Sequence, residues 1–543
     1  MTAEEGRTVP LRAIAIALAA VFLADYLYTA WTWLAWNRHS GFAQDSWLLY
    51  ALAVKEGRSV PMGNDLPLYP FILSLWAGRD PSAFTWSKLF SLAWSAATLA
   101  AVYRVGSSLF DRRTALLAGL ALSVNWIFLS FSMSLRAEIM LPLLFLMNWY
   151  CTWQGFSEGK GQWWLAAGVF AGLAFLTKGT ATLLVAAWGG AFVVASIRDR
   201  GLWRRAPWLL AGFLPLAAIL WWGNLQMFGD PAYNFSVRHA MWLDSWWDLP
   251  NRSLEELTFA GYVASHGWTG VLSRIALGMV HFAPVSLACL APSSSFPLPY
   301  TLRWLFVIAM AGVLWGARGR IRSELRERRG EAWFTALLLA LFFFLFSWYH
   351  QVSSSERFIG PLNPILFLLL ARAAVLTWDE YSPRLERFPK VKQWLPGVLA
   401  GLVALTAVTT VIKLTQWGLL DPFQADRPLD CYAKAYSWVG KKTVPVLYGP
   451  SGDLPTWQLS SRPRFVTVPA EDPPEDLAKW LNEKGARYAV VDWDMADKPF
   501  LSGHFKKLGD RGVLITRPLP GWRVIDDDRA HRLPHLLLLE RDP

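Results

Sequence analysis

Charged side chains and cysteines are both scarce in this 543-residue sequence, and each shortage excludes a class of protein. Charged residues make up 17% and hydrophobic residues 54%, a balance that soluble globular proteins do not have. The three cysteines, Cys151, Cys289 and Cys431, show neither pairing nor metal-site spacing. The sequence therefore predicts a membrane protein without disulfides or a cysteine-bound metal.

Nucleic-acid binding is excluded by the way the charges are distributed. Positive charges exceed negative ones by 11, yet from Asp421 onward the sequence holds 18 basic and 18 acidic residues. The whole excess therefore belongs to the apolar first 420 residues, and the soluble part has no basic surplus for nucleic acid. We predict membrane lipids as partners and no nucleic acid.

Long apolar runs fill most of the first 420 residues. Runs of about 17–25 residues can cross a hydrocarbon core as helices, so the sequence predicts a polytopic α-helical membrane protein with about 11–13 transmembrane helices. The first run shows no cleavage site and is expected to remain as an anchor. The expected spans are 11–36, 84–103, 114–131, 137–153, 162–176, 180–197, 208–222, 271–291, 300–316, 331–349, 357–376 and 394–412.

Arginine-rich linkers set the expected orientation, because positively charged loops stay on the cytoplasmic side. Six arginines lie within 317–330 alone. Keeping every such linker inside requires that 271–291 does not cross completely, so we expect a surface or re-entrant segment there. An odd number of crossings then places the C-terminus outside a cell inner (plasma) membrane.

Residues 421–543 have the composition of a soluble domain, whereas residues 1–420 form the predicted transmembrane domain. We expect a small α/β domain on the outer, periplasmic or extracellular side, without a Gly-rich phosphate loop or a metal cluster. A helix is predicted at 474–485, where proline precedes and glycine follows an amphipathic stretch. Strands are predicted at 443–449, 464–468, 487–494, 522–526 and 535–540.

Two polar segments, 37–80 and 223–270, are predicted to form loops outside the membrane. The first is too polar to span and is expected to fold back on the membrane surface, and the second can cover it as a lid. Candidate acceptor-binding or lid residues in these loops are Asp65, Tyr69, Arg238 and His239.

Several ionisable residues are expected near one level on the outer side: Asp45, Arg136, Glu138, Lys178, Glu356 and Arg357. Such residues at membrane depth are costly and indicate function. The ordinary alternative is that Arg136 and Glu138 pair with each other, while Lys178 and Arg357 extend to lipid head groups. Carboxylates facing cations are what glycosyl transfer from a phospholipid-linked sugar requires, because a base must take a proton and cations must stabilise the leaving phosphate.

Four motifs in order resemble those of the C-type membrane glycosyltransferases, which are related to protein O-mannosyltransferases and to the lipid A aminoarabinose transferase. The resemblance covers roughly residues 10–412, and the C-terminal domain is similar to those of bacterial relatives. The motifs are the outer acidic loop with LPLYP (66–70), SLRAEIMLPLLFL (134–146), LTKGT (176–180) and ERFIGPLNPILFLLLARA (356–373).

The resemblance implies transfer of a sugar from a polyprenyl-phosphate donor to a lipid, glycan or protein acceptor on the outer face. Asp45 matches the essential acidic residue of the first outer loop, and Glu138 matches a second acidic residue. Arg357 matches a basic residue that contacts donor phosphate or lines the cavity, and with Lys178 and Arg136 it forms the expected phosphate site.

The sequence departs from the family pattern in the first loop and leaves alternatives open. Gln44 and Asp45 stand where relatives often have an Asp-Glu pair, and Asp65 precedes LPLYP where relatives often have Lys or His. Asp65 joins Asp45 around a divalent cation or is an ordinary turn residue, so metal dependence stays undecided. The alternatives for function are a lipid or solute transporter, against which no internal repeat is found, and a non-catalytic family member.

We expect Asp45→Asn to lower sugar transfer by a factor of about 10², because asparagine cannot accept the acceptor's proton. Asparagine caps a helix nearly as well as aspartate. If Asp45 only caps a helix that begins at Ser46, the variant should therefore keep its rate of sugar transfer. Transfer by the purified variant distinguishes the two roles, with expression and thermal stability as controls. Near wild-type transfer would remove Asp45 from catalysis.

Overall fold

The computed structural model describes most of the predicted transmembrane domain and the strands that follow it. The chain forms two compact units, which are described separately: residues 1–31, 61–69 and 90–417, and residues 32–60, 70–89 and 418–543. The described residues are parts of 20–34, then 43–58, 66–197, 200–245, 252–290, 300–387, 446–448, 464–466, 476–492, 496, 503–508, 512–526 and 536–542.

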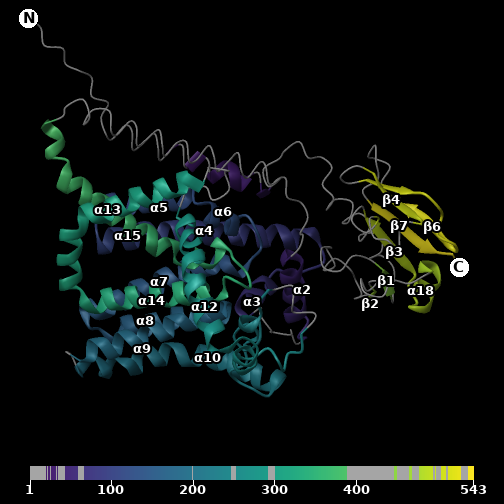
Figure 1. Cartoon of the computed structure of the whole chain (residues 1–543), viewed down its shortest axis with the longest axis horizontal. Helices are drawn as coiled ribbons and strands as arrows, with labels where there is room; N and C mark the ends of the chain where they lie inside the picture. The colour runs from purple at the N-terminus through teal and green to yellow at the C-terminus, as the bar shows by residue number, and fades with distance from the viewer. Residues whose placement is uncertain are drawn as a thin grey trace, which may run out of the picture. The chain divides into compact units, whose positions relative to one another are not determined.

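Helices make up the described part of the chain as far as residue 387 (Figure 1). They are α2 (Ala43–Lys55), α3 (Leu68–Ser74), α4 (Pro81–Leu109), α5 (Arg112–Ser123), α6 (Trp126–Ser132), η1 (Ala137–Ile139), α7 (Met140–Glu158), α8 (Gly161–Thr177), η2 (Gly179–Ala181), α9 (Thr182–Ser196), η3 (Arg200–Arg205), α10 (Ala206–Phe228), α11 (Phe235–Arg238), η4 (Ala240–Trp242), α12 (Phe259–Ala288), α13 (Tyr300–Glu327), α14 (Arg329–Tyr349), η6 (Glu356–Phe358), η7 (Gly360–Leu362), α15 (Asn363–Tyr381) and η8 (Arg384–Arg387).

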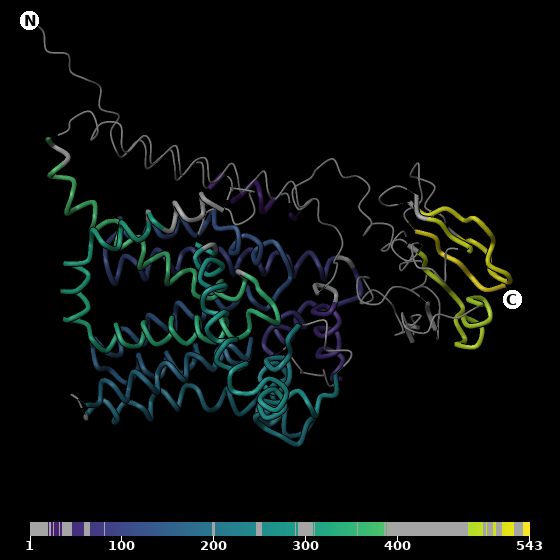
Figure 2. The backbone as a smooth tube through the Cα atoms, viewed as in Figure 1, coloured from purple at the N-terminus to yellow at the C-terminus, as the bar shows by residue number. Residues whose placement is uncertain are grey.

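The predicted polytopic helical fold is confirmed. Within the described residues, six helices are long and apolar enough to cross a membrane, or seven if the bent pair α5 and α6 is one span. Helices far apart in the sequence lie side by side, with α14 beside α7 and α9, and α15 beside α5 (Figure 2). The predicted spans at 11–36 and 394–412 lie mostly or wholly outside the described residues.

One predicted span, 114–131, is wrong as a single helix. Its two halves, α5 and α6, meet at an angle of 66°. The buried Asn125 causes the break, because its side chain accepts a hydrogen bond from the Phe128 amide and so caps α6. Asn125 also donates to the Cys289 carbonyl at 2.7 Å and accepts from Asn363 at 2.9 Å, which fixes the bend against α12 and α15.

The predicted arginine-rich loop at 317–330 is mostly helix. α13 continues through it to Glu327, and α14 begins two residues later at Arg329. Arginine and glutamate favour helix, so charge alone does not end it. The prediction that 271–291 is an incomplete crossing stays a prediction: α12 has the length and composition of a span, but it breaks at Gly267 (φ 66°) and runs across the neighbouring helices (Figure 1).

The described residues of segment 37–80, the predicted first outer loop, contain two short helices, α2 and α3. α2 begins at Ala43 and thus has Asp45 in its first turn, so a capping position ahead of Ser46 is wrong. An acidic residue in a first turn is favoured by the helix dipole. Lys55 at the end of α2 donates to the Ala77 carbonyl at 2.5 Å, and Glu56 pairs with Arg58 and Arg79.

The C-terminal domain contains the predicted α/β elements. Its strands are β1 (Val446–Tyr448), β2 (Arg464–Val466), β3 (Tyr488–Asp492), β4 (Phe505–Leu508), β5 (Gly512–Ile515), β6 (Trp522–Asp526) and β7 (Leu536–Arg541), with helix α18 (Leu477–Glu483). Five strands form a mixed sheet in the order β2-β1-β3-β7-β6, in which β1 is parallel to β2 and β3 and β7 is antiparallel to its neighbours. The hairpin β4-β5 was not predicted.

Glycines allow α8 and α10 to pack closely. A Cβ atom on Gly168 would lie 2.1 Å from the Leu209 carbonyl oxygen, and one on Gly212 would lie 2.2 Å from that of Leu165. Small residues are the usual means by which membrane helices approach each other. This pair of helices carries the turn with Lys178 at one end.

We expect Gly212→Ala to destabilise the protein by about 1–3 kcal/mol, because the added methyl group must push α8 away. Gly223 in the same helix has open space where its Cβ would lie, which makes Gly223→Ala the matched control. Thermal unfolding of the detergent-purified protein should show a lower midpoint for Gly212→Ala alone. Equal midpoints for the two variants would contradict the packing.

Candidate functional site

Three short segments bring the predicted charged residues to one end of the helical unit. Glu138 lies in η1 at the start of α7, Lys178 lies between α8 and η2, and Arg357 lies in η6. Segment η7 packs against η1, η6 and α7. Lys178 has an extended backbone (φ −158°, ψ 142°) that ends α8. Helix ends thus supply all three side chains.

The central contact of the site is an ion pair. Lys178 Nζ donates to Glu138 Oε1 at 2.6 Å, and the two side chains are 27% and 14% exposed. The alternatives that Glu138 pairs with Arg136 and that Lys178 extends to head groups are therefore wrong. Burial raises the pKa of Glu138, but Lys178 and Arg357 together lower it to about 2. Glu138 is therefore a carboxylate at any physiological pH.

Arg136 and Arg357 add positive charge around this pair. Arg357 is exposed and acts electrostatically on both Glu138 and Arg136. Burial lowers the pKa of Arg136, Glu138 raises it, and Arg357 lowers it again. Among the described side chains, three cations thus act on one carboxylate, which leaves an excess of positive charge. Such a cluster suits a phosphate group, because arginine and lysine donate charge-assisted hydrogen bonds to phosphate oxygens.

Tyr69, predicted as an acceptor or lid residue, is fully buried beside the cluster. Burial raises the pKa of its hydroxyl, which also interacts with Ser91, Glu138 and the Arg136 backbone. Its ring lies 6.3 Å from that of Phe90. This position favours a role in holding Glu138 and Arg136 over direct contact with an acceptor.

The other two predicted lid residues make contacts within their own loop. Arg238 pairs with Asp230 at 2.6 Å. The buried His239 lies with Nδ1 3.3 Å from the Leu257 carbonyl oxygen. The loop is shorter than predicted, because α10 extends to Phe228 and α12 begins at Phe259.

Asn234 connects this loop to the charged cluster, and no pattern in the sequence indicated this contact. A Cβ atom on Gly179, next to Lys178, would lie 2.4 Å from Asn234 Nδ2. The amide of Asn234 therefore lies directly against the turn that carries Lys178.

Three predicted acidic residues have side chains outside the described residues: Asp45, Asp65 and Glu356. Asp45 lies in α2, which belongs to the second unit. Among the described residues, no group of three or more histidine, cysteine, aspartate or glutamate side chains could hold a metal ion.

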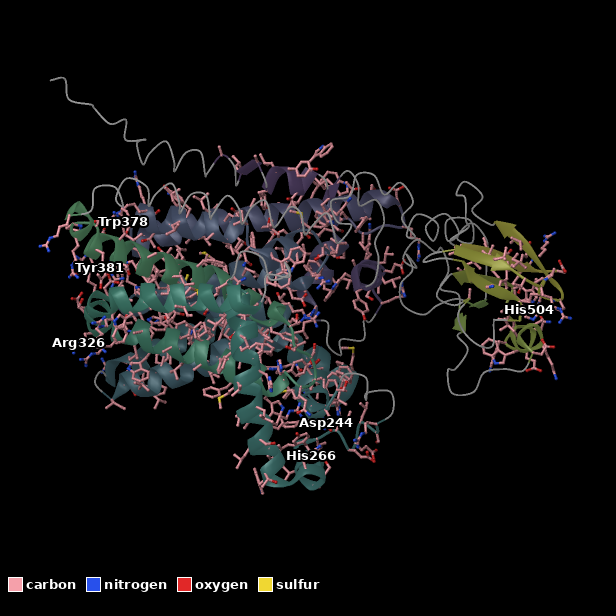
Figure 3. The ribbon with its side chains drawn as sticks, turned by 45° about the horizontal axis from the view of Figure 1, so that its top comes forward. Asp244, His266, Arg326, Trp378, Tyr381 and His504 are labelled. Carbon is pink, nitrogen blue, oxygen red and sulfur yellow. The ribbon has the colours of Figure 1, made fainter. Side chains whose placement is uncertain are left out.

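A second polar cluster was missed. Asp244 lies 3.3 Å from His266 Nε2 (Figure 3). It also lies 3.8 Å from Arg274 Nη1. The buried Arg274 lies over the rings of Tyr262 and Trp348 and donates to the Trp348 carbonyl. The sequence did carry a signal for this cluster, because Arg274 is a charged residue within the apolar run 271–291.

Comparisons with known proteins agree with the membrane fold. Residues 67–222 match the family model described as dolichyl-phosphate-mannose-protein mannosyltransferase. The solved structure of ArnT from Cupriavidus metallidurans in the apo state is 16% identical, with a TM-score of 0.55, and covers 97% of this chain and 98% of that one. None of the curated proteins matches the sequence.

The chain has the fold of the C-type membrane glycosyltransferases. ArnT in complex with undecaprenyl phosphate is 15% identical, with a TM-score of 0.54, and covers 96% of this chain and 97% of that one. Oligosaccharyltransferase AglB from Archaeoglobus fulgidus, in complex with an inhibitory peptide and a dolichol-phosphate, is 15% identical, with a TM-score of 0.52. The match covers 90% of this chain and 72% of that one. The predicted resemblance to C-type glycosyltransferases is therefore confirmed.

We expect Glu138→Gln to destabilise the protein by about 1–3 kcal/mol at pH 7, because the half-buried Lys178 loses its charged partner. Lys178→Gln breaks the same pair, so the double variant should lose less than the sum of the single variants. Thermal unfolding at pH 8 and pH 6 measures these differences.

The pH dependence follows from the lowered pKa of Glu138. An unfolded glutamate titrates at about 4.3, so stabilisation by folded Glu138 is complete above that value and disappears as the pH falls toward 2. The difference between wild type and Glu138→Gln should therefore be equal at pH 8 and pH 6. Additive losses, or a difference that vanishes at pH 6, would contradict the pairing.

Proposed function

We propose that this protein is an integral-membrane glycosyltransferase that moves a sugar from a polyprenyl-phosphate donor to a lipid, glycan or protein acceptor. The fold and the match at residues 67–222 support a glycosyltransferase. Undecaprenyl phosphate in ArnT and a dolichol-phosphate in AglB support the donor class. We place the reaction at the outer face of the cell inner membrane, with residues 421–543 on the same side.

The observation that carries this proposal is the cluster of Lys178, Arg136 and Arg357 around Glu138. In the reaction, the acceptor's oxygen or nitrogen bonds to the anomeric carbon as the bond from that carbon to the phosphate oxygen breaks. The electron pair stays on the phosphate, which gains negative charge. Cations held in place before the reaction stabilise that charge without reorganisation.

Glu138 suits the role of an anchor for the cations better than that of a base. With its pKa lowered to about 2, it holds a proton too weakly to remove one from an acceptor at neutral pH. It instead fixes Lys178 at 2.6 Å and offsets part of the repulsion among the cations. On the sequence argument, Asp45 is the group that takes the acceptor's proton.

Lys178 and Arg357 have different parts in phosphate binding. Arginine offers a planar fork for two oxygens, whereas lysine is a compact point charge. Arg357 is exposed and lies over the Phe358 ring at 5.1 Å, so its guanidinium is accessible. Lys178 is oriented by its bond to Glu138. The lysine supplies charge, and the arginine fixes the orientation of the phosphate.

We expect Arg357→Lys to weaken binding of undecaprenyl phosphate about tenfold, because lysine keeps the charge but loses the fork. Arg252→Lys is the matched control, since Arg252 is exposed and lies in the 229–258 loop outside the cluster. Titration of the lipid into the detergent-purified protein measures the affinity. An unchanged affinity would exclude Arg357 from the phosphate site, and an equal loss in the control would show a nonspecific charge effect.

A further inference from the structure

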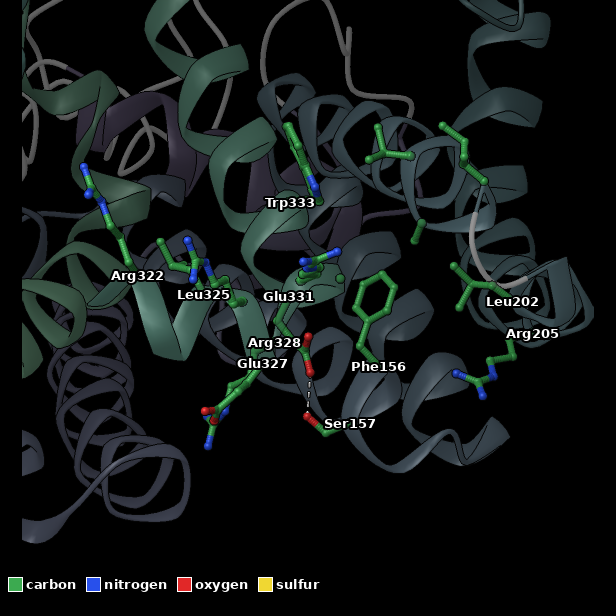
Figure 4. A pocket seen from close by; sticks show the side chains of 16 residues that line it. Phe156, Ser157, Leu202, Arg205, Arg322, Leu325, Glu327, Arg328, Glu331 and Trp333 are labelled. Atoms are coloured by element: carbon green, nitrogen blue, oxygen red, sulfur yellow. Dashed lines mark hydrogen bonds between the residues drawn. The ribbon is translucent and has the colours of Figure 1, made fainter. Parts of the chain in front are cut away.

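A cavity of about 1130 Å³ opens at the arginine-rich end of the helical unit, where α13 meets α14 (Figure 4). The ends of α7 and α9 and the turn η3 complete its wall. Five arginines and two glutamates line it: Arg205, Arg322, Arg326, Arg328, Arg329, Glu327 and Glu331. Its lining therefore has a net positive charge.

Two arginines that do not line this cavity are paired with carboxylates, and they provide a comparison for the arginines that line it. Arg113 donates to both carboxylate oxygens of Asp379 at 2.9 Å, and Arg320 lies 3.3 Å from Glu380. Within the described part of the chain, no carboxylate lies within 4.0 Å of the charged groups of the arginines that line the cavity.

The two glutamates do not neutralise this charge. The buried Glu331 accepts a hydrogen bond from the Ser157 hydroxyl at 2.7 Å (Figure 4). Glu327 is exposed and makes no ion pair with another described residue. Arg328 donates to the Leu109 carbonyl at 3.4 Å and lies over the Trp153 ring, so neutral groups hold it. The cavity thus retains guanidinium groups that an anion could satisfy.

The same cavity has an apolar wall. Ile197, Leu325 and Trp333 are 79%, 49% and 48% exposed. Helix α14 and the segment η2-α9 are both candidate membrane spans, and their ends line the cavity. Large exposed apolar side chains beside arginines at the end of a span lie where acyl chains meet head groups. A soluble anion would gain nothing from this wall.

We propose that the cavity binds the phosphate head group of an anionic phospholipid from the adjacent leaflet. The arginine forks receive the phosphate oxygens, and the acyl chains lie along Ile197, Leu325 and Trp333. Basic pockets between membrane helices are typical sites for anionic head groups. This lipid is distinct from the sugar donor, because the cavity shares no residue with the Glu138 cluster.

Phosphatidylglycerol titrated into the full-length protein in phosphatidylcholine nanodiscs tests the proposal, with bound lipid counted by native mass spectrometry. We expect the double variant Arg322→Gln, Arg329→Gln to need about ten times more phosphatidylglycerol in the nanodisc for half-saturation. The control double variant Arg104→Gln, Arg112→Gln removes two exposed arginines outside the cavity and should leave the half-saturating amount of phosphatidylglycerol unchanged. All four side chains are exposed, and an unchanged thermal midpoint verifies folding.

A loss confined to the cavity variant supports the proposal. Equal losses in both variants would show general attraction to surface charge, and no loss in the cavity variant would remove the site, so either result overturns it. A further arm adds inorganic phosphate at millimolar concentration. Displacement of the lipid by phosphate would assign the cavity to a soluble anion and overturn the lipid proposal, whereas retention supports it.

Discussion

The ion pair between Glu138 and Lys178 is the interaction on which the candidate site depends. A carboxylate that is 14% exposed would be costly without a partner, and Lys178 satisfies it at 2.6 Å. The pair joins the start of α7 to the turn after α8, and close glycine packing holds α8 against α10. It therefore fixes the position of a positive charge that the proposed reaction needs.

The helical fold was largely predictable from the sequence, because a repeated series of apolar runs of spanning length is typical of membrane helices. The ends of the helices were harder to predict. α10 continues to Phe228, beyond the predicted end of its apolar run. α13 continues to Glu327, because arginine and glutamate favour helix and extend it beyond its apolar run. The bend at Asn125 had a signal in the sequence, a polar residue in an apolar run. The hydrogen bond that fixes the bend had none, because it comes from Asn363, 238 residues away.

The members of the charged cluster were predicted, but their pairing was not. Arg136 and Glu138 are neighbours in the sequence, so they were the natural candidates for a local pair. The structure pairs Glu138 with Lys178 instead, which depends on how two helix ends meet in space. Asn234 and Arg274 were missed for the same reason, because their roles come from tertiary contacts with Gly179 and Trp348.

Positive charge gathers in two places, each with a different surrounding. The Glu138 cluster is held by one half-buried carboxylate, and the arginine cavity lies next to exposed apolar side chains. The Glu138 cluster is the proposed binding site for the donor phosphate. A density map of the protein with added undecaprenyl phosphate tests it most directly: the account predicts phosphate density within hydrogen-bond distance of Lys178 and Arg357. Phosphate density bound elsewhere, with these two side chains free of it, would contradict the account.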